Sequence, residues 1–249
     1  LSPIPESIMS AVCHFPSLED AVMTAQQVIQ YGVPIARIEM LNADQMGISI
    51  NYSKLKDIEA VPTLFFEFHG SESSNKENIE IVEELSKDNK GSSFKWAKDL
   101  EDRNKLWQAR WDVYYSVKAL NDNGRVYSTD VCVPISKITE CVKFAEEKAK
   151  EFGVRAPMVG HMGDGNFHVV LPYDPAKKEM YKQLRAFNSS LIRKALELEG
   201  TITGEHGVGL HKKEYLLEQH PDSIPVMKSI KRTLDPNNIM NPGKIFDLN

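Results

Sequence analysis

Two histidines seven residues apart are the side chains in this sequence best placed to do chemistry. His161 and His168 belong to the stretch Gly-His-Met-Gly-Asp-Gly-Asn-Phe-His, which ends at His168. Asp164 and Gly165 between them are a strong signal for a tight β-hairpin, because a type I′ turn needs two residues with positive φ. A two-residue turn at this point predicts that the two histidines lie directly opposite each other on one face of the hairpin. They are then either two ligands of one metal ion or two unrelated polar residues.

A second candidate stretch, residues 203–209, reads Thr-Gly-Glu-His-Gly-Val-Gly and sets Glu205 beside His206. Its glycines run in the reverse order of the dinucleotide fingerprint, and a carboxylate would repel a phosphate, so we do not interpret it as a phosphate loop. Flanking glycines favour a backbone held close to a neighbour over a solvated loop. Together, His161, His168 and Glu205 would offer one ion three ligands and leave positions open, which is typical of a catalytic metal site.

The composition is that of an ordinary globular protein. Of 249 residues, 41% are apolar and 26% are charged, and the formal net charge is −5. This balance gives no reason to expect nucleic acid as a partner, and no apolar run is long enough to span a bilayer. Cys13, Cys132 and Cys141 form no Cys-x-x-Cys pair, so we expect buried thiols in a reducing compartment. The sequence begins without an initiator methionine, and we expect it to be a piece of a longer protein.

The elements that must position these residues alternate between strands and helices. Strands are predicted over 8–14, 35–41, 61–69, 92–96, 125–133, 156–162 and 167–173. Helices are predicted over 17–31, 75–89, 99–120, 136–152 and 175–198, with two short helices over 210–219 and 222–234. Residues 42–60 are expected to hold a short helix or an irregular excursion.

This order predicts an α+β fold of ferredoxin-like, duplicated β-α-β units. Such units form a largely antiparallel sheet with helices on one face, here followed by a C-terminal helical segment. No Pro/Gly/Ser-rich linker divides the chain, which favours one compact unit over residues 1–249. Arg110 lies in the longest predicted helix, on one face with Leu106 and Val113. It is either a side chain that reaches water at the edge of an amphipathic face or a functional cation.

The motifs together resemble the C-terminal substrate domain of the FAD-linked oxidases of the vanillyl-alcohol oxidase type. The resemblance spans nearly the whole chain and rests on residues 159–168, 203–209 and 240–244, the last reading Met-Asn-Pro-Gly-Lys. Residues 62–70 and 127–135 are similar to the branch of the family that oxidises D-lactate. The family's N-terminal FAD-binding domain is absent from this sequence, so we expect the fragment alone to be inactive.

The resemblance implies an FAD-dependent enzyme that oxidises D-lactate to pyruvate in the mitochondrion. Hydride would pass to the flavin, and the electrons would continue to an acceptor such as cytochrome c. The family pattern implies His161, His168 and Glu205 as ligands of a divalent ion, zinc or manganese, and His206 as the base for the substrate hydroxyl. It implies further contacts as follows: Arg110 to the substrate carboxylate, Asn166 to the substrate beside the metal, and Asn241 and Lys244 to FAD.

Two positions bear on which acid is oxidised. Relatives that act on D-2-hydroxyglutarate resemble this chain but carry a lysine at the position of Ser128 and an asparagine at that of Val170. A second substrate carboxylate needs its own cation, because a buried unpaired charge costs several kcal/mol. We therefore expect a small monocarboxylic D-2-hydroxy acid as the substrate, with the 2-hydroxyglutarate type as the alternative within the family.

Two other classes of function stay open at this point. A metal-dependent hydrolase could use Glu205 or His206 to activate water, and it would be active with the metal alone. A non-catalytic, metal-stabilised docking domain would leave substrate oxidation intact after His206→Ala.

Overall fold

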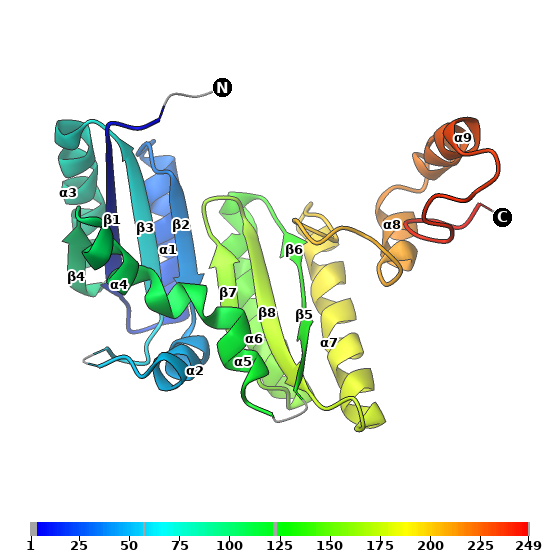
Figure 1. Ribbon diagram of the computed structural model, residues 1–249, viewed down its shortest axis with the longest axis horizontal. Helices are drawn as coiled ribbons and strands as arrows, with labels where there is room; N and C mark the ends of the chain where they lie inside the picture. The colour runs from blue at the N-terminus through cyan, green and yellow to red at the C-terminus, as the bar shows by residue number, and fades with distance from the viewer. Residues whose placement is uncertain (1–3, 57, 122–123, 249) are drawn as a thin grey trace.

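The computed structural model describes residues 4–56, 58–121 and 124–248. Within these ranges, eight strands form one sheet in the order β4-β1-β3-β2-β7-β8-β5, with β6 paired to β8 (Figure 1). Every pairing is antiparallel. The strands are β1 (Ser7–His14), β2 (Arg37–Leu41), β3 (Thr63–Gly70), β4 (Ser92–Ala97), β5 (Arg125–Ser128), β6 (Val131–Cys132), β7 (Met158–His161) and β8 (Asn166–Tyr173).

The helices connect these strands and extend the chain beyond the sheet. They are α1 (Leu18–Gln30), α2 (Ala43–Ser53), α3 (Glu72–Asp88), α4 (Leu100–Trp111), α5 (Val113–Lys118), the 3-10 helix η1 (Ile135–Lys137), α6 (Ile138–Phe152), α7 (Lys178–Glu197), α8 (Lys213–Gln219) and α9 (Ile224–Leu234). The predicted α+β fold class is confirmed. The order β4-β1-β3-β2 is that of a ferredoxin-like unit. In the second half of the sheet, β7, β8 and β5 take three of the four strand positions of another such unit.

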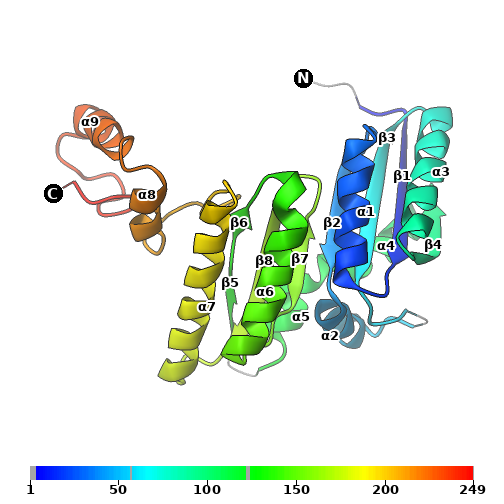
Figure 2. The ribbon, with the colours of Figure 1, turned by 180° about the vertical axis from the view of Figure 1, so that it is seen from behind.

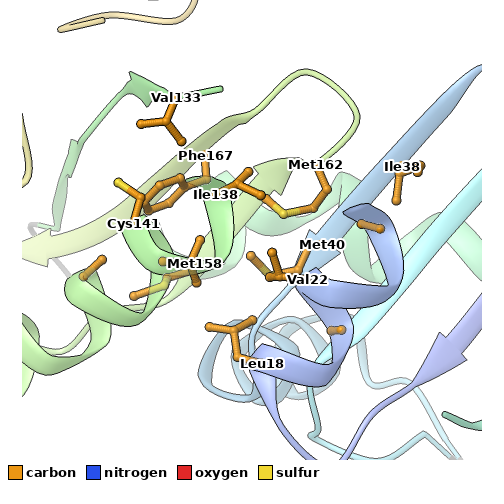
Figure 3. Packing of buried hydrophobic residues seen from close by; sticks show 14 of the residues in the cluster. Leu18, Val22, Ile38, Met40, Val133, Ile138, Cys141, Met158, Met162 and Phe167 are labelled. Carbon is orange, nitrogen blue, oxygen red and sulfur yellow. The ribbon is translucent and has the colours of Figure 1, made fainter. Parts of the chain in front are cut away.

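The two units join where β2 pairs with β7 in the middle of the sheet. Glu39 lies opposite His161 across this seam, and Leu41 lies opposite Val159. A single hydrophobic cluster continues over the seam, and Figure 3 shows Met40 of β2 near Met158 of β7 beneath the helices. The second unit therefore packs against the first instead of forming a separate body.

The helices lie on both faces of the sheet. The long helices α1, α3, α6 and α7 cover one face (Figure 2), but the prediction that the helices lie on one face only was wrong. The short helices α2, α4 and α5 lie across the other face, and there they bury a smaller cluster that includes Trp107, Val113 and Val170. The prediction of one continuous helix over 99–120 was wrong. The segment breaks at Asp112, whose carboxylate accepts hydrogen bonds from Ser53 and Gln108.

Strand β8 shows how the sequence divides these two faces. Phe167, Val169 and Leu171 belong to the cluster under the long helices. His168 and Val170 alternate with them and therefore point to the opposite face. The polar side chains described below gather on this second face of the sheet, near the end of β7.

The C-terminal segment, comprising α8, α9 and the tail that follows, projects beyond α7 away from the strands (Figure 1). The two short helices predicted here are confirmed, each beginning two or three residues later than expected. Among the described residues, no helix is both long and apolar enough to cross a bilayer.

The three cysteines are free thiols, but they are not equally buried. Cys13 and Cys141 are buried as expected, whereas Cys132 is only partly covered. Burial raises the pKa of Cys13 to about 11 and that of Cys141 to about 12. At pH 8 this lowers the thiolate fraction of both by about 100-fold or more relative to a free cysteine of pKa ~8.5.

Burial also raises the pKa of Cys132, but its sulfur is only partly covered, so we expect an alkylating reagent at pH 8 to label Cys132 before Cys13 or Cys141. Peptide mass spectrometry of a labelling time course would measure this order, with the unfolded protein as the reference for full reactivity. Labelling of Cys141 as fast as Cys132 would contradict the packing of α6.

Candidate active site

The β7–β8 hairpin turns through four residues instead of two. His161 pairs with Asn166, and His168 pairs with Val159, so the predicted direct pairing of the histidines was wrong. Gly165 takes a positive φ of 73°, but Asp164 does not, so the type I′ turn does not form. The backbone N–H of Asp164 donates to His161 O over 3.0 Å, which closes a four-residue turn. A Cβ at position 165 would lie 2.1 Å from the carbonyl oxygen of Val133, so only glycine fits.

The two histidines nevertheless share one face and converge. A register shift of two residues keeps every side chain on its own face of the sheet. The imidazole centroids of His161 and His168 lie 5.6 Å apart with the rings nearly perpendicular. The prediction that the hairpin brings these two rings together is thus confirmed, although they are diagonal and not direct neighbours.

Each histidine has its Nδ1 fixed by an oxygen that can only accept a hydrogen bond. Nδ1 of His161 donates to Glu39 Oε1 over 2.8 Å, and Nδ1 of His168 donates to the carbonyl oxygen of Thr129 over 2.9 Å. Both rings therefore carry a proton on Nδ1 and turn Nε2 toward the carboxylate of Glu205. The hydrogen bond with Glu39 raises the pKa of His161, whereas burial lowers that of His168.

The spacing of these three side chains suits one metal ion. Glu205 Oε1 lies 3.3 Å from Nε2 of His161 and 2.9 Å from Nε2 of His168. Ligands about 2.0–2.1 Å from a tetrahedral zinc ion stand roughly 3.3 Å from one another. The candidate ligand atoms all lie within 4.8 Å of each other.

The surroundings of His168 add a second reason to expect a cation. Its Nε2 is buried and makes no hydrogen bond among the described residues, since Glu205 is close but poorly aligned. In the neutral ring, the Nε2 lone pair faces a carboxylate oxygen, and two acceptors at that distance repel. A divalent ion between them would satisfy both.

The loop that carries Glu205 and His206 is held in place by hydrogen bonds to Asp130. This carboxylate is 0% exposed and accepts from the backbone N–H of His206 over 2.9 Å and from that of Glu205 over 3.3 Å. The Thr203 hydroxyl and the Lys212 ammonium add contacts of 2.5 and 3.3 Å. Burial alone would raise the pKa of Asp130, but these hydrogen bonds and the charge of Lys212 hold it well below its usual range.

Asp130 is a residue that the sequence reasoning missed. The predicted strand over 125–133 breaks after Ser128, and the break places Thr129 beside His168 and Asp130 beneath the loop. Gly204 passes so close to Asn166 that an added Cβ would lie 1.9 Å from the amide nitrogen. A close approach of the backbone was expected from the glycines, but the sequence did not identify what it approaches.

His206 stacks face to face on His168. The ring centroids are 4.7 Å apart and the planes differ by 12°. The side chains of Glu205 and His206 both reach this site, where Glu205 Oε1 lies 3.8 Å from His206 Nε2. Asp130, His168 and His206 even form an alternative group with metal-ligand spacing. The oxygens of Asp130 are already occupied by donors of the loop, so the group containing Glu205 fits an ion better.

Arg110 reaches the site through Glu39. Its Nε and Nη2 both lie 2.9 Å from Glu39 Oε2, while the other oxygen of Glu39 binds His161. Burial alone would raise the pKa of Glu39, but the hydrogen bond from His161 and the charge of Arg110 lower it. Glu39 was also missed. Its signal in the sequence is a single acidic residue within the apolar strand Ile-Glu-Met-Leu of β2.

The remaining predicted residues lie at different distances from this cluster. Asn166 is buried, and its amide nitrogen donates to Asp130 and to the Val131 carbonyl, so it supports the loop. Asn241 and Lys244 bond to each other in the C-terminal tail, outside the cluster. Their roles toward substrate and FAD stay predictions. Ser128 lies opposite Val170 across the β5–β8 ladder, Ser128 exposed and Val170 buried beneath α5.

Comparison with known proteins defines the class. Residues 4–245 match the family described as FAD linked oxidases, C-terminal domain. This chain belongs to that family.

Particular relatives are similar to it over nearly its full length. The protein of Danio rerio named probable D-lactate dehydrogenase, mitochondrial, is 44% identical over 98% of this chain and 49% of its own length. The Arabidopsis thaliana D-lactate dehydrogenase (cytochrome), mitochondrial, is 36% identical over 99% of this chain and 43% of its own length. The chain thus spans about half the length of the curated relatives it matches.

Solved structures agree on the fold. The crystal structure of p-cresol methylhydroxylase with substrate bound matches all of this chain and 54% of that chain, with a TM-score of 0.70 and 14% identity. The 4-ethylphenol oxidase of Gulosibacter chungangensis matches 99% of this chain and 55% of that chain, with a TM-score of 0.71 and 17% identity.

Proposed function

We propose that this chain is the substrate- and metal-binding domain of an FAD-dependent dehydrogenase that oxidises D-lactate to pyruvate. The observation that carries the proposal is the convergence of His161, His168 and Glu205 beside His206, in a chain of the FAD-linked oxidase family. The relatives named D-lactate dehydrogenase support the substrate, and the word mitochondrial in their names supports a mitochondrial location. Those named as cytochrome enzymes support an acceptor such as cytochrome c.

The roles follow from the chemistry of each side chain. His161, His168 and Glu205 would hold the divalent ion, zinc or manganese. When bound, that ion supplies a Lewis acid that makes a nearby hydroxyl easier to deprotonate. Flavin, when bound, supplies the redox chemistry by accepting the hydride from C2 of the substrate.

The other side chains would orient the substrate and move its proton. His206 would take the hydroxyl proton, a role that suits imidazole because histidine changes charge near neutral pH. Arg110 would bind the substrate carboxylate with the edge of its guanidinium that is not directed at Glu39. Asn166 would border the substrate from beneath the loop, and Asn241 and Lys244 would contact FAD from the tail.

Substrate preference tests this proposal. In the flavin-loaded protein that contains this chain, we expect kcat/KM for D-lactate to exceed that for D-2-hydroxyglutarate by about 10-fold or more. The reason is that burying a second carboxylate without a cation beside it costs several kcal/mol. Each 1.4 kcal/mol corresponds to a tenfold change in kcat/KM. A higher kcat/KM for D-2-hydroxyglutarate would contradict the proposed substrate.

Ser128→Lys should lower the ratio of kcat/KM for D-lactate to kcat/KM for D-2-hydroxyglutarate, because it adds the missing cation on the same face as His168. Ser128→Gln is the matched control, since it lengthens the side chain without adding a charge.

Hydrolysis of an ester or amide by the metal-loaded protein without flavin would favour the hydrolase alternative instead.

A further inference from the structure

Glu39 makes two contacts whose combination constrains His161. One carboxylate oxygen accepts from His161 Nδ1 over 2.8 Å, and the other accepts from Arg110 Nε and Nη2 over 2.9 Å. The Glu39 side chain is 8% exposed, and Arg110 comes from α4. Glu39 and His161 are also direct partners in the β2–β7 ladder, so the backbone fixes their separation.

An ionised carboxylate can only accept hydrogen bonds, and so it forces the proton of a neutral His161 onto Nδ1. Nε2 is then unprotonated and points toward Glu205, 3.3 Å away. His168 reaches the same state by donating Nδ1–H to a carbonyl oxygen. Metal-binding histidines commonly have their second nitrogen held in this way by a carboxylate or a carbonyl group.

We propose that Glu39, oriented by Arg110, is a positioning residue that fixes the His161 tautomer and presents Nε2 to a divalent cation. This deepens the proposed function and rests on its metal site. It also gives Arg110 a task besides binding substrate, because its two hydrogen bonds hold one oxygen of Glu39 while the other oxygen binds the ring.

The substitution Glu39→Gln tests this with almost no change of shape. Arg110 can only donate, so the glutamine must turn its oxygen toward Arg110 and its NH₂ group toward His161. Nδ1 of His161 then has to accept, and its proton moves to Nε2, the ligand atom. We expect the affinity for Zn²⁺ to fall about 10–100-fold, the usual cost of losing the partner that orients a ligand.

Removing Arg110 should reverse this effect. In Glu39→Gln/Arg110→Met, the amide is free to flip and can again accept from Nδ1. We expect the Zn²⁺ affinity of the double variant to return to within about threefold of Arg110→Met alone, a coupling that a merely structural role for Glu39 would not produce.

Glu67 provides a matched control on the neighbouring strand. Its Oε1 lies 2.8 Å from Arg37 Nη2 and 2.9 Å from His69 Nε2, so it joins the same residue types without touching a candidate ligand. Glu67→Gln should leave the Zn²⁺ affinity within about threefold of the parent. Thermal melting of each variant would show whether the fold is retained.

The experiment uses the protein that contains this chain, stripped of metal and titrated with Zn²⁺ against a chromophoric chelator. Side-chain ¹⁵N NMR of the metal-free protein would report the proton of His161 on Nδ1 in the parent and on Nε2 in Glu39→Gln. An unchanged affinity in Glu39→Gln, or a double variant as weak as Glu39→Gln, would overturn the inference. A parent that binds neither Zn²⁺ nor Mn²⁺ would instead refute the proposed metal site itself.

Discussion

Replacing His206 by alanine is expected to lower kcat for D-lactate by roughly 10²–10⁴-fold, the usual contribution of a positioned base. The ring stacks on His168 and is partly exposed, so it lies beside the candidate ion and within reach of a substrate. The ligand set proposed here does not include it, so His206→Ala should retain its stoichiometric metal. Steady-state kinetics and metal analysis on the same preparation would measure both quantities.

His211 is the control for this experiment, because it is an exposed histidine only five residues along the same segment. His211→Ala should keep both metal and kcat. Loss of metal in His206→Ala would place His206 among the ligands, as the alternative group with Asp130 and His168 allows. Full activity with full metal would instead support the non-catalytic docking domain.

The double substitution His161→Ala/His168→Ala is expected to remove the bound ion and nearly all activity. The ion would contribute several kcal/mol of transition-state stabilisation, which corresponds to a loss on the order of 10³-fold in kcat/KM. Inductively coupled plasma mass spectrometry after gentle purification would give the metal content. The single variant Glu205→Ala should behave similarly, because its carboxylate is the third ligand.

A second pair of strand histidines makes the matched control. His14 bonds to Thr63, and His69 bonds to Glu67, but neither touches the candidate site. His14→Ala/His69→Ala should keep its metal even though it also removes two hydrogen-bonded rings. Stoichiometric metal in His161→Ala/His168→Ala would rule out the proposed ligand set.

The sequence by itself determined most of the order of strands and helices and the common face of the two histidines. Alternation in β8 requires His168 to point away from Phe167 and Val169, whatever the exact pairing. The turn signal at Asp164 and Gly165 places His161 on the adjacent strand. The observed register differs from the predicted one by two residues. Because two is an even number, the two histidines still lie on the same face of the sheet.

Only the tertiary structure decided what surrounds those histidines. Glu39 lies 122 residues before His161, and Asp130 lies 76 residues before His206, so no local pattern connects either pair. The break between β5 and β6 was equally invisible, because residues 125–133 read as one strand, yet the break is what turns Thr129 and Asp130 toward the site. Local sequence preferences determine whether a segment forms a helix or a strand. The partners of buried polar atoms depend instead on which distant segment the packing of the two units brings alongside them.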